Sequence, residues 1–315
     1  MLDIELRFQE AIDASRSVAI AGHINPDGDA IGACLAMAAC LDKIGKEVAV
    51  LLEDYDPKYD VIPGKRYLYH GDYDALAPDL FIALDSSTPD RLGRAFEVMK
   101  RAKATALFDH HLNNSIEADM RLTDPSAPST TLMVYNYISR RIMIDVNIGA
   151  AIYAGIIYDT GGFRHRSTTP ETLEVAAKLM HIGVDFSKIY SGIMFEKSRD
   201  KTRLFAEAIS RIAYAEPGIA YTYITQADVS ELGGNYPDGV IDYLINIRGV
   251  DTAIYALQKE EGTEVSLRSR TVNVGELAGK LGGGGHKAAA GFLAKDKPAE
   301  VIEMIVRTLK AEQQQ

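Results

Sequence analysis

The chain has 315 residues, of which 47% are hydrophobic and 25% charged, and its formal net charge at pH 7 is −10. This composition is that of a globular protein, and the length predicts two domains rather than one. The acidic balance argues against binding to long duplex nucleic acid, which requires a basic face, so any nucleic-acid ligand should be short and held at one local site.

The first half of the chain alternates short apolar runs with helical patterns, after an amphipathic segment at 1–17. Strands are predicted at 17–22, 47–52, 80–84 and 104–108, and helices at 31–43, 91–101, 128–140, 147–158 and 170–180. This alternation predicts an α/β domain with a mostly parallel, doubly wound sheet and helices on both faces.

The apolar pattern thins between about residues 185 and 205, where no strand signal appears. We therefore predict a larger domain at 1–185, a linker at 186–205 and a second domain at 206–315. In the second domain, strands are expected at 218–225, 251–260 and 263–270, followed by a glycine-rich stretch and a final helix at 299–311. These features predict a smaller α+β domain.

We expect a cytoplasmic protein without a membrane span. No apolar run reaches the roughly 18 residues that a spanning helix needs. The N-terminal segment does not have the pattern of a signal peptide. Cys34 and Cys40 fall in a predicted buried helix and lack metal-type spacing, which favours a reducing compartment.

Acidic residues and histidines follow the predicted strands of the first half, where each strand ends. His23, Asp27 and Asp29 follow the first strand, Asp85 the third, Asp109, His110 and His111 the fourth, and Asp159 follows a predicted helix. Because the carboxyl ends of parallel strands share one edge of a sheet, we expect these side chains to converge. Each position alone is more typical of a cap, a turn or a structural histidine, so the whole set carries the signal.

Carboxylates and imidazoles without cysteine suit divalent cations, with Mn²⁺ ahead of Zn²⁺, and with Mg²⁺ or Co²⁺ as further candidates. The set exceeds what one ion needs. Two ions about 3.5–4 Å apart that share a carboxylate form the arrangement used to hydrolyse phosphate esters. Asp27 and Asp29 lie two apart in a turn and can contact different ions, while Gly28 and Gly32 should let the backbone bend and approach closely.

Several segments in this order resemble the motifs of the DHH phosphoesterase superfamily. The segments are HINPDGDAIG, ALDSS, FDHH and YDTGGF in the first domain, with VSLRS and GGGGHKAAAGF resembling the DHH-associated domain. The resemblance covers nearly the whole chain. The size and domain pair are most similar to the branch of nanoRNases that are also pAp phosphatases.

The resemblance implies a role for each motif residue. One ion would be held by His23, Asp27, Asp85 and Asp159, and the other by Asp29, Asp85, His110 and Asp159. Asp109 would orient a metal-bound histidine, and His111 would face the scissile phosphate. In the second domain, the expected substrate contacts are Arg268, Ser269, Gly283, Gly284, Gly285 and His286, the glycines offering backbone N–H groups to an anion. On its own, the glycine run would read as a hinge or turn.

The implied activity is hydrolysis of short RNA oligonucleotides to mononucleotides, together with removal of the 3′-phosphate of pAp. A phosphodiesterase for cyclic di-AMP or its linear product pApA needs the same metal site and remains an alternative. A non-catalytic nucleotide sensor on the same fold is the alternative from another class. The resemblance also implies a homodimer through the larger domain, although the sequence itself leaves the oligomeric state open.

Overall fold

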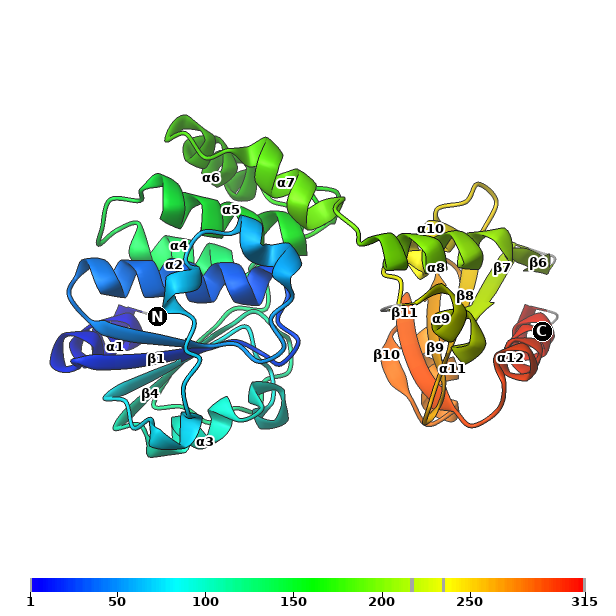
Figure 1. The fold of residues 1–315 in the computed structure, drawn as a ribbon, viewed down its shortest axis with the longest axis horizontal. Helices are drawn as coiled ribbons and strands as arrows, with labels where there is room; N and C mark the ends of the chain where they lie inside the picture. The colour runs from blue at the N-terminus through cyan, green and yellow to red at the C-terminus, as the bar shows by residue number, and fades with distance from the viewer. Residues whose placement is uncertain (1, 216–217, 234–235, 314–315) are drawn as a thin grey trace. The chain divides into compact units, whose positions relative to one another are not determined.

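The computed structural model describes residues 2–215, 218–233 and 236–313, which fall into two compact units, Met1–Glu196 and Lys197–Gln315 (Figure 1). The division between them lies inside the predicted linker 186–205. Most of that segment is helical, because α7 (Phe186–Met194) and α8 (Arg199–Ser210) occupy it.

The first unit is built on a five-stranded sheet with the order β2-β1-β3-β4-β5. Its strands are β1 (Ser17–Ala21), β2 (Glu47–Leu51), β3 (Leu80–Leu84), β4 (Ala104–Asp109) and β5 (Met120–Thr123). Every pairing between these strands is parallel, which confirms the predicted sheet. The sequence did not reveal β5, because it is short and only Met120 in it is buried.

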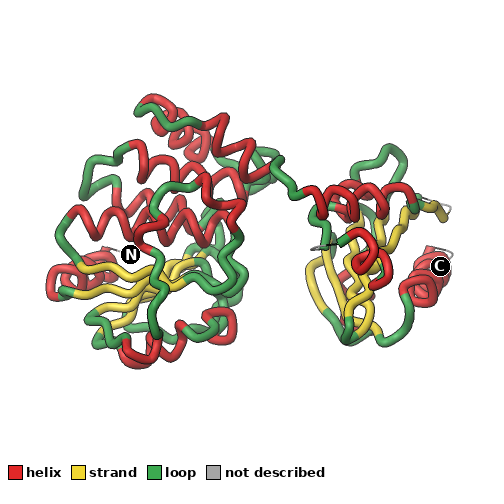
Figure 2. Tube along the Cα trace, in the orientation of Figure 1, coloured by secondary structure: helices red, strands yellow, loops and turns green. Residues whose placement is uncertain are grey.

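Helices cover both faces of this sheet, as predicted (Figure 2). One face carries α1 (Leu2–Ala14), α2 (Gly28–Lys43) and α4 (Thr130–Ile138), and the other carries α3 (Ala95–Arg101). α5 (Val146–Asp159) packs on α2 and α4, and α6 (Pro170–His181) and α7 pack on α5 (Figure 1). Alternate strand residues face opposite cores: Ile20 and Phe108 pack with α2, α4 and α5, whereas Phe81 and Leu107 pack with α3.

Two helices begin elsewhere than the sequence suggested. α2 starts at Gly28 rather than at residue 31, because the Asp27 side chain caps it and accepts hydrogen bonds from the backbone N–H groups of Asp29 and Ala30. α3 starts at Ala95 rather than at residue 91, because a short 3₁₀ turn ends at Gly93, whose φ of 54° interrupts the helical backbone.

The second unit holds a six-stranded mixed sheet with the order β10-β11-β9-β8-β7-β6. Its elements are α8, β6 (Ala213–Ala215), β7 (Ile219–Ile224), α9 (Gln226–Leu232), α10 (Val240–Ile245), β8 (Thr252–Lys259), β9 (Gly262–Ser269), α11 (Val274–Lys280), β10 (Gly284–His286), β11 (Ala289–Ala294) and α12 (Pro298–Gln313). α8 and α10 pack on one face of the sheet, and α11 and α12 pack on the other. This is the predicted smaller α+β domain.

Candidate metal centre

The loop after β1 brings His23 and Asp27 together. His23 Nδ1 donates to the Ile24 carbonyl at 2.9 Å, which leaves Nε2 as the ring's outward nitrogen. That nitrogen lies 3.5 Å from Asp27 Oδ2 and 3.8 Å from Asp85 Oδ2. Asp27 uses its other oxygen to cap α2, so Oδ2 is directed toward the cluster. One imidazole nitrogen and two carboxylate oxygens thus face a common point.

Asp29 is fully buried against the start of α4. Its Oδ2 accepts from the Thr130 N–H at 2.7 Å, and its Oδ1 accepts from the Thr131 N–H at 2.9 Å. The positive end of the α4 dipole suits a carboxylate. Burial, and then the nearby Asp159, nevertheless raise the pKa of Asp29 well above its usual value. Its ionised form therefore calls for further positive charge.

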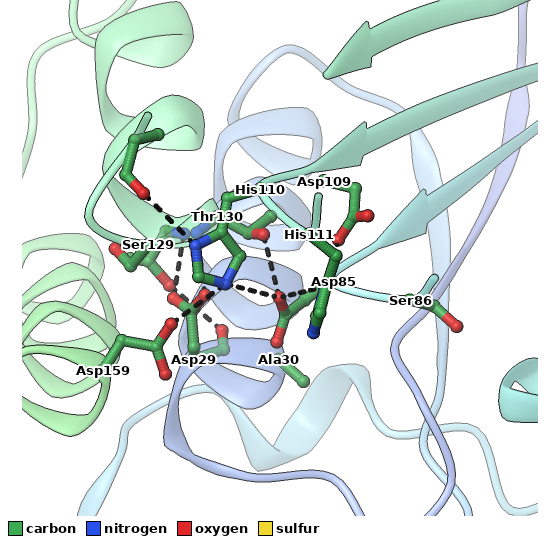
Figure 3. Close-up of polar contacts among 12 residues, drawn as sticks. Asp29, Ala30, Asp85, Ser86, Asp109, His110, His111, Ser129, Thr130 and Asp159 are labelled. Atoms are coloured by element: carbon green, nitrogen blue, oxygen red, sulfur yellow. Dashed lines mark hydrogen bonds and ion pairs between the residues drawn. The ribbon is translucent and has the colours of Figure 1, made fainter. Parts of the chain in front are cut away.

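Asp85 lies at the middle of the cluster, directly after β3, in the left-handed backbone region with a φ of 56°. Its Oδ1 accepts a hydrogen bond from Thr130 Oγ1 at 2.9 Å and lies 3.6 Å from His110 Nε2 (Figure 3). Its Oδ2 faces His23. Burial, and then the neighbouring carboxylates, raise its pKa well above the usual value. One oxygen of Asp85 thus faces His23, and the other faces His110.

His110 and Asp159 complete the far side of the cluster (Figure 3). His110 Nδ1 donates to the Ala127 carbonyl at 3.2 Å, and its Nε2 lies 3.0 Å from Asp159 Oδ2. Burial alone would lower the pKa of His110, but the Asp159 hydrogen bond and the nearby carboxylates raise it to about 10. Asp159 ends α5, which has no basic residue in its last turn, so its charge sits at the negative end of a helix. A metal cation at this point would offset that charge and displace the proton of His110.

Asp109 contacts a different histidine from the one expected. It was predicted to orient a metal-bound histidine, but its Oδ1 lies 2.6 Å from Nδ1 of His111, the residue assigned to the phosphate. The Ala127 carbonyl takes the orienting role at His110. The Asp109 hydrogen bond is the main cause that raises the pKa of His111.

The donor set fits divalent cations. There are three groups of residues within which the ligand atoms all lie within 4.8 Å of one another. These groups are His23, Asp27 and Asp85; Asp29, His110 and Asp159; and Asp85, His110 and His111. Among the described residues, the four clustered carboxylates form ion pairs with histidines and with no Lys or Arg, so divalent cations could replace the histidine protons. Oxygen and imidazole donors are the ligands that such cations take in proteins.

Glycines bring α2, α4 and α5 close enough to form this cluster. A Cβ on Gly32 would lie 2.5 Å from the Ala151 carbonyl, and one on Gly155 would lie 2.0 Å from Thr131 Oγ1 and 3.0 Å from Asp29 Oδ1. The expected close approach at Gly28 and Gly32 is confirmed. The expected backbone bend is wrong, because both residues lie inside α2.

In the second unit, Arg268 and His286 lie on one face of the sheet. Arg268 on β9 is opposite Ala289 on β11, and Ala289 is opposite His286 on β10. Directly opposed residues of antiparallel strands point to the same side, so the side chains of Arg268 and His286 face the same way. Arg268 is half-buried, with Nε 3.6 Å from Asp242 Oδ1, and His286 is exposed.

The glycine-rich stretch forms a strand rather than a loop. Gly284 and Gly285 belong to the exposed edge strand β10. The N–H of Gly283 donates to the Ala278 carbonyl at 2.9 Å, so it is not free to bind an anion as predicted. Ser269 is only 4% exposed, and its Oγ accepts from the Val272 N–H and shares a hydrogen bond with Thr252. Both groups form hydrogen bonds within the fold, and their assignment to the substrate stays a prediction.

Sequence reasoning missed two contributors to the first unit's cluster. Thr130 was seen only as part of a helix start, yet it contacts both Asp29 and Asp85. The sequence gives no indication of the role of Asn114, whose side chain donates a hydrogen bond to Asp109. Neither residue type is diagnostic by itself; the only local signal was the position of each residue near a cluster motif.

Comparisons with known proteins agree with this architecture. Residues 17–156 match the model of the DHH family, N-terminal domain, and residues 219–315 match the DHHA1 domain. The chain is 33% identical over 285 residues to the bifunctional oligoribonuclease and PAP phosphatase NrnA of Thermus thermophilus, covering 88% of this chain and 83% of that protein. The chain belongs to the DHH family.

Two further likenesses place this DHH-family chain among related architectures. It is 28% identical to the cyclic-di-AMP phosphodiesterase GdpP of Geobacillus thermodenitrificans, over 95% of this chain but only 48% of that protein. The crystal structure of an exopolyphosphatase-related protein from Bacteroides fragilis matches 100% of this chain and 98% of that chain, with a TM-score of 0.89 and 23% identity. The second likeness shows that both domains share a known fold.

Among the described residues, no helix has the length and apolarity needed to cross a membrane.

Proposed function

We propose that this protein is a metal-dependent phosphoesterase that hydrolyses short RNA oligonucleotides to mononucleotides and removes the 3′-phosphate of pAp. The observation that carries the proposal is the position of Asp85, whose two carboxylate oxygens face two separate groups of ligands. A shared carboxylate between two groups suits a pair of divalent cations, the arrangement used for phosphate-ester hydrolysis. Similarity to the Thermus thermophilus oligoribonuclease supports the choice of substrate.

The ligands of each ion follow from the groups. His23, Asp27 and Asp85 would hold one cation, and Asp29, His110 and Asp159 the other, with Asp85 between the two. Mn²⁺ is the expected ion. Bound cations would supply the Lewis-acid chemistry that activates water and stabilises charge on phosphoryl oxygens.

The chain's own contribution to the reaction centres on His111. Its Nδ1 proton is held by Asp109, so Nε2 is the nitrogen that can meet a phosphate. The hydrogen bond to Asp109 raises the pKa of His111, which favours a protonated Nε2. We assign His111 as the donor to the scissile phosphate or to the departing ribose hydroxyl. Arg268, His286, Gly284 and Gly285 would contact the substrate in the second unit.

Hydrolysis of cyclic di-AMP or pApA is the second candidate, favoured by the similarity to GdpP along nearly the whole chain. A non-catalytic nucleotide sensor is the third. The protein would be incubated with Mn²⁺ and an RNA dinucleotide, pAp or pApA, with Asp85→Asn as the inactive control. Faster release from the dinucleotide and pAp supports the proposal, faster cleavage of pApA supports the second candidate, and tight binding without turnover contradicts both.

A further inference from the structure

Asn114 lies half-buried in the loop after β4, and four hydrogen bonds fix its side-chain amide. Nδ2 donates to Asp109 Oδ2 at 2.6 Å and to the Ser86 carbonyl at 2.8 Å. Oδ1 accepts from the Ile116 N–H at 2.9 Å and from Arg121 Nη2 at 3.5 Å. If the amide were turned so that its oxygen and nitrogen exchanged places, the oxygen would face the Asp109 and Ser86 oxygens. The nitrogen would then face the Ile116 N–H, and these hydrogen bonds would be lost. The orientation of Asn114 is therefore set by its surroundings.

Asp109 passes this orientation to His111. The Asp109 side chain is fully buried, and each of its oxygens has one side-chain donor: Oδ2 from Asn114 and Oδ1 from His111 Nδ1 at 2.6 Å. A buried carboxylate held at both oxygens has one stable rotamer. The proton of His111 is thereby kept on Nδ1, and the ring plane is fixed. The His111 side chain itself is 41% exposed, so its other nitrogen is accessible.

We propose that Asn114 is a positioning residue for His111, acting through the Asp109 carboxylate. The inference rests on the proposed function, which places His111 at the phosphate. Without the Asn114 donor, Asp109 would have one unpaired buried oxygen and would rotate or recruit water, and the His111 ring would lose its single orientation. Substrate binding would change little, whereas the chemical step would slow.

A purely structural role is the competing account. Asn114 also joins the loops that follow β3 and β4, through the Ser86 carbonyl, and the backbone N–H of Ser115 donates to the Ser87 carbonyl nearby. If Asn114 only held these loops together, its loss would disturb the cluster as a whole. The effect would then appear regardless of whether His111 is present.

The kinetic test compares Asn114→Ala with Asn113→Ala. Asn113 is the exposed neighbour, and its side chain has no hydrogen bond among the described contacts. With Mn²⁺ and an RNA dinucleotide, we expect Asn114→Ala to lower kcat by about 10- to 100-fold with KM within about threefold, and Asn113→Ala to leave both unchanged. A loss confined to KM would overturn the proposal.

A double-mutant cycle separates the two accounts. In a His111→Ala background, Asn114→Ala should lower kcat by less than about twofold further, because its effect passes through His111. If Asn114→Ala lowers kcat equally in the wild-type and His111→Ala backgrounds, Asn114 only holds the loops after β3 and β4 together, and the proposal is wrong. If Asn114→Ala does not fold, Asn114→Leu, which has a similar size and no donor to Asp109, takes the place of the alanine variant.

The second readout needs neither metal nor activity. Nitrogen-15 NMR of the full-length, metal-free protein reports which nitrogen of His111 carries the proton, with His111→Ala used to assign the signal. At a pH high enough for the His111 ring to be neutral, we expect a single Nδ1–H tautomer in the wild type and in Asn113→Ala, and a mixture of tautomers in Asn114→Ala. An unchanged signal in Asn114→Ala would overturn the proposal. An inactive wild type with the expected NMR result would instead contradict the proposed function alone.

Discussion

At the scale of single residues, Thr130 links the two groups of ligands. Its backbone N–H holds Asp29 and its hydroxyl holds Asp85, at 2.7 and 2.9 Å. Two acidic side chains from different elements are thus fixed by one residue at the start of a helix. Preorganised ligands bind a metal more tightly, because less conformational entropy is lost on binding.

Thr130→Val should therefore weaken metal binding. The valine keeps the shape and the backbone N–H but removes the hydroxyl donor to Asp85, and we expect about tenfold weaker Mn²⁺ binding by calorimetric titration. Thr222→Val is the control, because the buried Thr222 hydroxyl donates to the Ala208 backbone carbonyl in the second unit and contacts no carboxylate of the cluster. Equal Mn²⁺ affinity in the two variants would contradict this role.

At the scale of elements, the cluster depends on three helices meeting with little space between them. The Asp29 carboxylate joins α2 to the start of α4, and Gly155 lets α5 approach both. The carboxylate of Asp159 then arrives from the end of α5. Helix packing at glycine contacts therefore determines the distances between the ligands.

Gly155→Ala should disturb both stability and metal binding. The new Cβ would meet Thr131 Oγ1 and Asp29 Oδ1, so we expect a loss of about 1–3 kcal/mol in the free energy of unfolding and weaker Mn²⁺ binding. Gly279→Ala, in α11 with open space around it, should be neutral or stabilising by up to about 1 kcal/mol. Urea unfolding measures both. A Gly155→Ala protein as stable as the wild type would contradict the packing argument.

In the second unit, an ion pair ties α8 to α9. Both oxygens of Asp228 accept from the Arg211 guanidinium, at 2.6 and 2.7 Å, and this contact lowers the pKa of Asp228 to about 2. A carboxyl with a lower pKa in the folded protein stabilises it above pH of about 4, and that contribution is lost as the pH falls toward 2.

Asp228→Asn should therefore cost about 1–2 kcal/mol of unfolding free energy at pH 7 and clearly less at pH 3. Urea titrations of the second unit's transition at the two pH values, for the wild type and the variant, measure the difference. A cost that is the same at both pH values would show that the ion pair does not provide this stability.

At the scale of the whole molecule, the features that could be predicted from the sequence are the strongly apolar strands and the residues that directly follow them. Asp85 and His110 could be placed because strong strands precede them and parallel strands end at one edge. The role of Thr130 could not be predicted, since its partner Asp29 is 101 residues away. The strand at Gly284–His286 could not be predicted, because glycine gives no strand signal and this strand depends on pairing with β11.

The net charge of −10 also belongs to this scale. A short substrate held through one or two phosphates should show a weak salt dependence, with log K falling by about 0.7 per phosphate contact for each tenfold rise in salt. Competition binding of the metal-loaded protein with RNA from two to twenty nucleotides measures this. A steep slope that grows with RNA length would contradict a local site.

The central claim is that the clustered carboxylates and histidines hold two divalent cations. Anomalous diffraction from crystals grown with Mn²⁺ tests it most directly. We predict two manganese peaks, one beside His23 and Asp27 and the other beside Asp29, His110 and Asp159, with Asp85 between them. A single peak, or none at this edge of the sheet, would contradict the account.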